Sequence, residues 1–186
     1  MAASNAILVG DVGGTNCRFA LAHKTEHAKT NQGGIELTSL SRLSVKDYPD
    51  FYEALEGYLS DLGERPTHIS FALAGPKFNG AIKMTNVDWT VSEDELKRRF
   101  GFESAILSND FAAMARGAAL MPDDGFQNII SGKVNYSHTV AVLGPGTGLG
   151  VAGILPSHRP QQPLRIYRLK GAIRLLHRKM KCKLRF

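Results

Sequence analysis

The sequence predicts an α/β protein, because short apolar segments typical of strands alternate with capped amphipathic segments typical of helices. Glycine-rich turns follow two of the apolar segments, at 10–16 and 144–150. The composition, with 43% hydrophobic and 22% charged residues, is that of ordinary globular proteins. With 186 residues the chain is long enough for one domain or two small ones.

The first expected elements are strands joined by a glycine turn. Residues 7–9 are apolar throughout, which is typical of a central strand buried on both faces. Residues 10–16 contain too much glycine to continue that strand, and 18–22 predict the second strand. A third strand is expected over 37–43, where the side chains alternate between two faces.

The first predicted helix covers 48–62, where apolar residues are spaced by three and four. Pro49 is expected in its first turn and Gly63 as its stop. Further strands are expected over 67–74, 81–85, 104–108, 139–143 and 151–155.

The second predicted helix opens with a capping box, in which Ser92 is the N-cap and Glu95 the third helical residue. It is expected to reach Phe100 and to stop at Gly101. A third helix is expected over 111–120.

Charge is unevenly distributed along the chain. The net charge of the whole chain is +6. Ten of the 23 basic residues and none of the 17 acidic residues lie in 156–186. The preceding residues therefore have 13 basic and 17 acidic residues, a net charge of −4. In that basic tail, apolar residues spaced by three or four from Ile166 to Leu184 are compatible with a cationic amphipathic helix for a membrane surface or a nucleic acid. The alternative, which we favour, is out-of-frame translation after a frameshift near codon 155.

Other features exclude several classes of protein. No run of 18 apolar residues occurs, the first ten residues lack a secretory pattern, and two cysteines cannot form a disulfide framework. A cytoplasmic protein is therefore expected, with no membrane partner and no specific nucleic acid.

The two glycine turns are candidate anion sites, because glycine permits consecutive backbone N–H groups to approach an anion. Thr15 and Thr147 add hydroxyl donors. Neither turn has the Gly-Lys-Ser/Thr ending of a Walker loop, and Leu149 stands where the dinucleotide fingerprint needs glycine or alanine. The alternative is a pair of tight β-hairpins whose glycines serve only the turns.

Two acidic positions have competing interpretations. Asp11 would be repelled by a phosphate unless a cation lay between them, which favours Mg²⁺ held directly or through water; the alternative is an Asx turn. Asp110, after the strand over 104–108, could be a general base. The alternative is that Asn109 or Asp110 caps the following helix.

Four segments in this order resemble the bacterial ATP-dependent glucokinases of the hexokinase, actin and Hsp70 superfamily. They are Gly-Asp-Val-Gly-Gly-Thr-Asn at 10–16, Met-Thr-Asn at 84–86 with Trp89, Asn-Asp-Phe at 109–111, and Gly-Pro-Gly-Thr-Gly-Leu-Gly at 144–150. The resemblance covers about 5–155 and implies a ribonuclease H-like (actin-like ATPase) fold. It also implies phosphoryl transfer from ATP, with Mg²⁺, to the 6-hydroxyl of glucose.

The resemblance implies a role for each matching residue. Asp110 is implied as the general base, with Asn109, Asp110 and Asn86 on the sugar and Asp11 as the Mg²⁺ residue. The implied nucleotide-binding residues are Gly10, Asp11, Val12, Gly13, Gly14 and Thr15 in the first loop and Gly144, Gly146, Thr147 and Gly148 in the second.

The resemblance also implies a domain organisation. Residues 1–110 are expected to form the small α/β domain, 111–155 the start of the larger domain, and 156–186 a tail outside the family pattern. The family's Ser-Glu-Gly-Gly-His segment is not found after Leu155, so impaired activity is expected. A non-catalytic sugar-binding module stays open as an alternative, and the intact family is expected to form homodimers.

Overall fold

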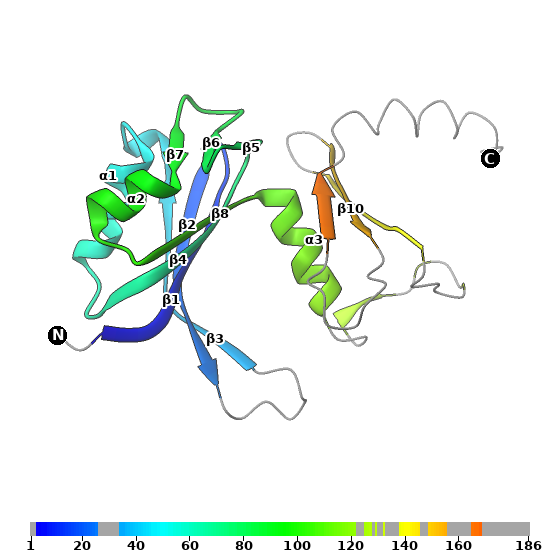
Figure 1. The fold of residues 1–186 in the computed structure, drawn as a ribbon, viewed down its shortest axis with the longest axis horizontal. Helices are drawn as coiled ribbons and strands as arrows, with labels where there is room; N and C mark the ends of the chain where they lie inside the picture. The colour runs from blue at the N-terminus through cyan, green and yellow to red at the C-terminus, as the bar shows by residue number, and fades with distance from the viewer. Residues whose placement is uncertain are drawn as a thin grey trace. The chain divides into compact units, whose positions relative to one another are not determined.

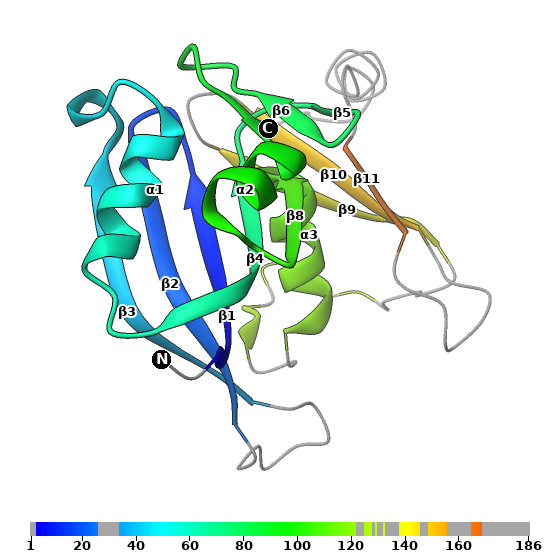
Figure 2. The same ribbon diagram turned by 60° about the vertical axis from the view of Figure 1, so that its left-hand side comes forward.

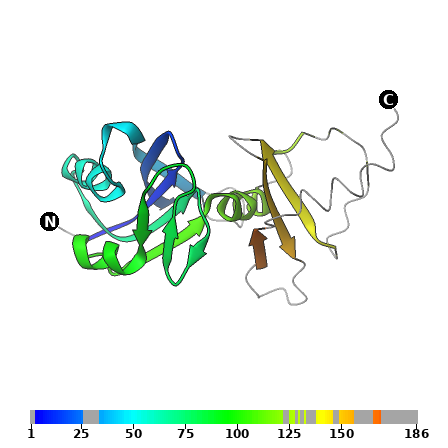
Figure 3. The same ribbon diagram turned by 90° about the horizontal axis from the view of Figure 1, so that it is seen from above.

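The computed structural model describes residues 3–25, 34–121, 125–127, 129, 132, 138–145, 149–155 and 165–168. The chain forms two compact units, Met1–Asp110 and Phe111–Phe186. Each unit has its own sheet (Figures 1 and 3). Among the described residues, no helix is long and apolar enough to cross a membrane.

The first unit is built on a five-stranded sheet in the order β3-β2-β1-β4-β8 (Figure 2). β1, β2 and β3 are antiparallel neighbours, whereas β4 and β8 run parallel to β1. The parallel strands therefore end at the same edge of the sheet. The strands are β1 (Ala3–Val12), β2 (Asn16–Thr25), β3 (Gly34–Ser44), β4 (Arg65–Leu73) and β8 (Ser104–Asn109).

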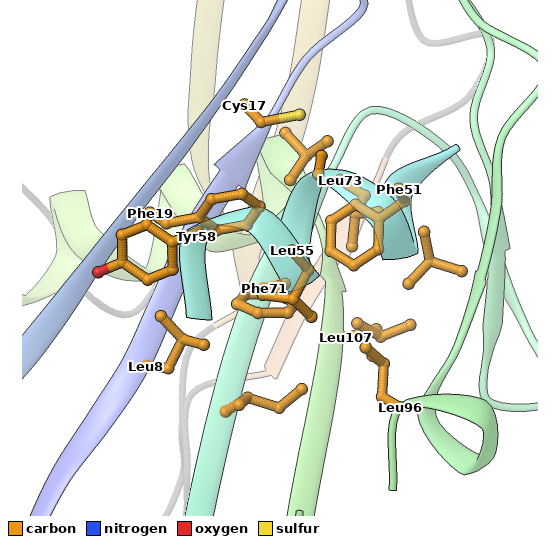
Figure 4. Close-up of a cluster of buried hydrophobic side chains, with 14 of the residues drawn as sticks. Leu8, Cys17, Phe19, Phe51, Leu55, Tyr58, Phe71, Leu73, Leu96 and Leu107 are labelled. Carbon is orange, nitrogen blue, oxygen red and sulfur yellow. The ribbon is translucent and has the colours of Figure 1, made fainter. Parts of the chain in front are cut away.

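Two helices cover one face of this sheet, α1 (Phe51–Ser60) and α2 (Glu93–Phe100) (Figure 2). Between α1 and the strands, Phe19, Phe51 and Phe71 pack with ring centroids 5.6–6.0 Å apart (Figure 4). All three side chains are 0–1% exposed. Burial of these large apolar surfaces is the main stabilising contribution to the unit.

A small antiparallel sheet in the order β5-β6-β7 completes the unit. Its strands are β5 (Lys77–Phe78), β6 (Ala81–Lys83) and β7 (Thr90–Ser92), and a 3₁₀ turn, η1 (Val45–Asp47), precedes α1.

The second unit contains one described helix, α3 (Asp110–Leu120, whose first residue is the last of the first unit), and a sheet in the order β11-β10-β9. Ala115 on α3 is fully buried and clusters with Ala152 and Ile154 on β10. The strands of this sheet are β9 (Val140–Pro145), β10 (Leu149–Leu155) and β11 (Arg165–Arg168).

The structure confirms the capping prediction for α2 in part. The Ser92 side chain accepts a hydrogen bond from the Glu95 N–H, and Gly101 ends the helix with a left-handed φ of 75°. The reciprocal bond of a capping box is replaced, because the Ser92 N–H donates to the Tyr52 hydroxyl at 3.1 Å. A tertiary contact thus replaces the local contact that the sequence predicts.

The predicted bounds of α1 are wrong at both ends. Asp50 is the N-cap, and its carboxylate accepts the Glu53 N–H at 2.8 Å, so Pro49 lies before the helix. The helix ends at Ser60 with Asp61 as C-cap, so that Gly63 is not its stop.

Two further expectations are also corrected. β1 is central but not buried on both faces, because Ile7 is 44% exposed while Leu8 is fully buried. In the basic tail, Arg165–Arg168 is a strand paired with β10 rather than part of a helix. The rest of the predicted tail helix lies outside the described residues.

Candidate functional site

The register of the parallel strands places the candidate residues of the first unit at one edge. Val12 on β1 is the ladder partner of Leu73 on β4, and Leu73 is the partner of Asn109 on β8. The three strands therefore end at the same level. The first glycine turn follows β1, and Asn109–Asp110 lies at the end of β8. In open α/β sheets, ligands bind outside these carboxyl ends.

Residues 10–12 continue β1, contrary to the expectation that glycine ends the strand at 10, because they pair with β2. The turn between β1 and β2 is therefore 13–15, and it is closed by a hydrogen bond from the Gly13 N–H to the Asn16 carbonyl at 3.0 Å. Within the described part of the chain, no residue accepts a hydrogen bond from the N–H of Gly14 or Thr15. Thr15 is exposed. The turn can thus offer two adjacent backbone donors and a hydroxyl to an anion.

Gly14 lies directly against Asn86, because a Cβ at Gly14 would be 2.5 Å from the Asn86 Cβ. The segment that contains Asn86 is fixed by the Thr85 N–H, which donates to the Ala74 carbonyl at 2.9 Å, and Ala74 in turn donates to Val12 at 3.1 Å. The turn and the Met-Thr-Asn segment, far apart in sequence, therefore meet at the end of β4.

Trp89 closes the loop that presents Asn86. Its backbone carbonyl accepts the Met84 N–H at 2.9 Å, and its indole N–H donates to the Pro49 carbonyl at 3.1 Å. Trp89 is only 4% exposed. Its place in the family motif is therefore explained by packing in the core rather than by contact with a ligand.

Asp11 lies on β1 opposite Arg18 on β2, and its Oδ2 forms an ion pair with the Arg18 guanidinium at 2.8 Å. The Asx-turn alternative is therefore wrong, because this side chain does not bond the glycine amides. Asp11 is 56% exposed at its side chain, so its carboxylate is accessible to a cation.

Gly10 and Val12 have packing explanations. A Cβ at Gly10 would lie 2.8 Å from the Phe71 ring and 3.0 Å from the Phe19 ring, and Val12 is fully buried. Both are in β1, where the position of the side chain is directed into the packed core.

Asn109 and Asp110 stand at the junction of β8 and α3. The buried Asn109 side-chain amide donates to the Gly75 carbonyl at 2.9 Å and to Asp110 Oδ1 at 2.7 Å. The first bond fixes the amide to the end of β4, and the second orients the carboxylate. Because Asp110 is the first residue of α3, the capping alternative stays open beside that of a base.

Gly75 contacts the candidate site through its carbonyl, whereas the sequence indicates it only as the end of a strand. A Cβ there would lie 2.3 Å from the Lys83 carbonyl oxygen, so only glycine allows this backbone to approach β6 and present its carbonyl to Asn109. Gly75-Pro76 was a visible turn signal, but nothing local indicated its partner.

In the second glycine segment, two residues are determined by packing. A Cβ at Gly144 would lie 2.9 Å from the Phe111 ring, and one at Gly150 only 1.7 Å from it. The antiparallel pairing of β9 and β10 agrees with the predicted hairpin. Gly146, Thr147 and Gly148 lie outside the described residues, so their phosphate role stays a prediction.

The described residues contain no group of three or more histidine, cysteine or acidic side chains able to hold a metal. Mg²⁺ commonly uses one or two carboxylates together with substrate phosphates and water, so a single exposed carboxylate such as Asp11 fits that ion. Burial raises the pKa of the neighbouring Cys17 thiol to about 11, with a smaller contribution from the charge of Asp11.

A cavity of about 300 Å³ lies elsewhere, between the ends of α1 and α2 and the start of β4, where Arg65 and Arg99 line it. Because β4 begins there and ends at Leu73, this cavity is at the opposite edge of the sheet from the candidate residues. It is not part of the candidate site.

The comparisons with known proteins agree with this arrangement. The glucokinase family model matches residues 8–166, so the match includes the first part of the basic tail. A glucokinase of Caulobacter sp. strain K31 is 40% identical over 158 residues, which are 84% of this chain and 46% of that protein. One from Chromohalobacter salexigens is 35% identical over 84% of this chain and 47% of its own length.

Solved structures give the same result. A glucokinase from an Antarctic psychrotroph superposes with a TM-score of 0.73 at 34% identity, over 90% of this chain and 51% of that one. A glucokinase from Balamuthia mandrillaris, solved with glucose, has a TM-score of 0.58 at 18% identity, over 89% and 47%; this likeness shows the fold alone. The chain spans about half the length of the curated relatives it matches. With a ribonuclease H-like fold and a family match over most of its length, this chain belongs to the glucokinase family.

Proposed function

We propose that this chain provides the sugar-phosphorylating edge of a glucokinase, which transfers the γ-phosphoryl group of ATP to the 6-hydroxyl of glucose. The observation that supports this most directly is the register that aligns Val12, Leu73 and Asn109. It brings the first glycine turn, the Asn86 segment and the Asn109–Asp110 pair to one edge of one sheet.

Asp110 is the general base in this proposal. A carboxylate at hydrogen-bonding distance from the sugar hydroxyl can accept its proton as the phosphoryl group is transferred. The Asn109 amide, which donates to Asp110 Oδ1, holds the carboxylate in one orientation. Asn109 and Asn86 supply further polar contacts to the sugar.

The first turn binds the phosphates. The N–H groups of Gly14 and Thr15 and the Thr15 hydroxyl supply donors that neutralise part of the anionic charge. Asp11 would hold Mg²⁺, and the bound ion would supply positive charge to the transferred group. The Arg18 guanidinium pairs with Asp11 Oδ2 at 2.8 Å, so the carboxylate would contact the ion through its other oxygen or through water.

The second glycine segment, with Gly144, Gly146, Thr147 and Gly148, is also proposed to bind phosphates of ATP. Cytoplasmic location, where ATP and glucose meet, and assembly into homodimers also belong to this proposal.

The test uses the purified 186-residue chain. We expect glucose to raise its melting temperature, because a ligand that binds only the folded state stabilises it. We also expect slow formation of glucose 6-phosphate from ATP in a coupled assay, lost in Asp110→Asn. Absence of both stabilisation and product refutes the proposal, while stabilisation without product supports the alternative of a sugar-binding module.

A further inference from the structure

Glu93, the first residue of α2, joins three separate parts of the first unit. Its Oε1 accepts a hydrogen bond from the Leu107 N–H on β8 at 2.7 Å and pairs with the Lys77 ammonium on β5 at 2.6 Å. Its own N–H donates to the Gly80 carbonyl at 2.9 Å. One side chain thus ties the small sheet and α2 to the last strand of the large sheet.

The contact with Leu107 is at a position where the sheet itself offers no partner. β8 is the edge strand, with β4 on its inner side only, so an outward-facing N–H there has no neighbouring strand. Leu107 is 2% exposed, and a buried N–H without an acceptor is costly. The Glu93 carboxylate takes the place of a sixth strand at this one point.

The Lys77 ammonium compensates the charge of the Glu93 carboxylate at this partly buried position. The Glu93 side chain is 20% exposed and that of Lys77 is 39% exposed, so the pair is partly withdrawn from solvent. A charge-assisted bond to a backbone N–H is stronger and shorter than a neutral one. The ammonium offsets the charge that such a bond would otherwise bury alone.

Leu107 is two residues before Asn109, the last residue of β8, and three before Asp110, the first residue of α3. Displacement of the β8 backbone at Leu107 would therefore move the Asn109 amide away from the Gly75 carbonyl. We propose that Glu93, held by Lys77, is a positioning residue that fixes the end of β8 and with it the Asn109–Asp110 pair. The effect of Glu93 on catalysis rests on the proposed function of Asp110 as the general base.

The first experiment measures amide hydrogen exchange by NMR in the full chain. In Glu93→Ala, exchange of the Leu107 amide should become on the order of tenfold faster, as for the loss of one charge-assisted hydrogen bond. The amides of Asn109 and Asp110 should follow, while those of β1 stay unchanged. Glu93→Asp, which keeps the charge but shortens the reach, should behave in the same way and is a variant less prone to misfold.

Glu93→Gln separates positioning from stability. It loses the ion pair with Lys77 and the charge assistance but keeps an oxygen acceptor for Leu107, so its melting temperature should fall, Leu107 exchange should accelerate less than in Glu93→Ala, and turnover should stay near that of the wild type. Glu95→Ala is the matched control, because Glu95 is on the same helical turn and pairs only with Arg98 among the described residues. It should change neither exchange at Leu107 nor turnover.

Unchanged exchange at Leu107 in Glu93→Ala and Glu93→Asp overturns the proposal, as does acceleration spread equally over the whole unit. Turnover that follows the melting temperature across all variants, Glu93→Gln included, also overturns it and leaves Glu93 a structural role alone. If the wild-type chain forms no glucose 6-phosphate, the proposed function fails, whereas the exchange measurements still decide whether Glu93 fixes β8.

Discussion

The side-chain amide of Asn109 donates to the carbonyl oxygen of Gly75 at 2.9 Å. This bond joins the ends of two parallel strands at the point where both approach the candidate site. Since the same amide also donates to Asp110, the orientation of the proposed base depends on a glycine 35 residues earlier in the chain.

The proposed base should be separable from sugar binding. Asp110→Asn keeps the size of the side chain but removes the proton acceptor, so turnover should fall by about 10²-fold or more. Glucose-dependent stabilisation should change much less. A coupled assay and a thermal melt measure the two effects, and near-normal turnover in the variant would remove Asp110 from the role of base.

The close approach of Gly14 to Asn86 predicts that Gly14→Ala disrupts the first turn. The new methyl group would overlap the Asn86 Cβ, and the displacement should destabilise the unit by about 1–3 kcal/mol. ATP-dependent stabilisation should weaken as well. Gly63→Ala is the control, because nothing lies within 4 Å of a Cβ there; equal stability of the two variants contradicts the contact.

The glycines of the second hairpin should be sensitive because of Phe111. Gly150→Ala places a methyl group inside the Phe111 ring volume, so the second unit should become more susceptible to proteolysis. Replacing the ring by a smaller side chain in the double variant Gly150→Ala/Phe111→Ala should restore part of the resistance. If the double variant is no better than the single one, the ring is not the cause.

Gly117 offers a stabilising substitution within α3. A Cβ there meets nothing within 4 Å, and alanine is favoured over glycine in a helix interior by about 0.5–1 kcal/mol. Gly117→Ala should therefore raise the free energy of unfolding by about that amount in a denaturant titration. A decrease would show that the position packs against something outside the described residues.

The buried thiol of Cys17 predicts a loss of stability at high pH. Its pKa in the folded protein is raised to about 11, whereas a thiol in an unfolded chain titrates near 8.5–9. The neutral thiol thus contributes stability that is complete below pH 9 and is lost as pH rises towards 11. Cys17→Ala should remove this part of the pH dependence between pH 9 and 11.

Sequence reasoning predicted the elements of the first unit well where the determinants are local. The Ser92 cap, the Gly101 stop and the hairpin after β1 depend on neighbouring residues, and they were found. The strand order was not predicted from the residues alone, because it depends on pairing between segments such as β1 and β4, more than 50 residues apart.

The sequence indicates which residues are candidates for the site, but it does not indicate the contacts that these residues make. Arg18 facing Asp11, and the Gly75 carbonyl facing Asn109, follow from strand register, which no local pattern encodes. For the same reason the sequence alone does not reveal that aromatic side chains leave no room for a Cβ at Gly10 and Gly144, two of the glycines predicted to bind the nucleotide, or at Gly150.

All three parallel strands place their candidate residues at one rim of the first unit, and β4 begins at the opposite rim with Arg65. That far rim can accept attachments that leave the chemistry undisturbed. A fluorophore or a surface tether coupled near Gly63, where there is open space, would therefore leave the opposite rim free for the proposed ligands.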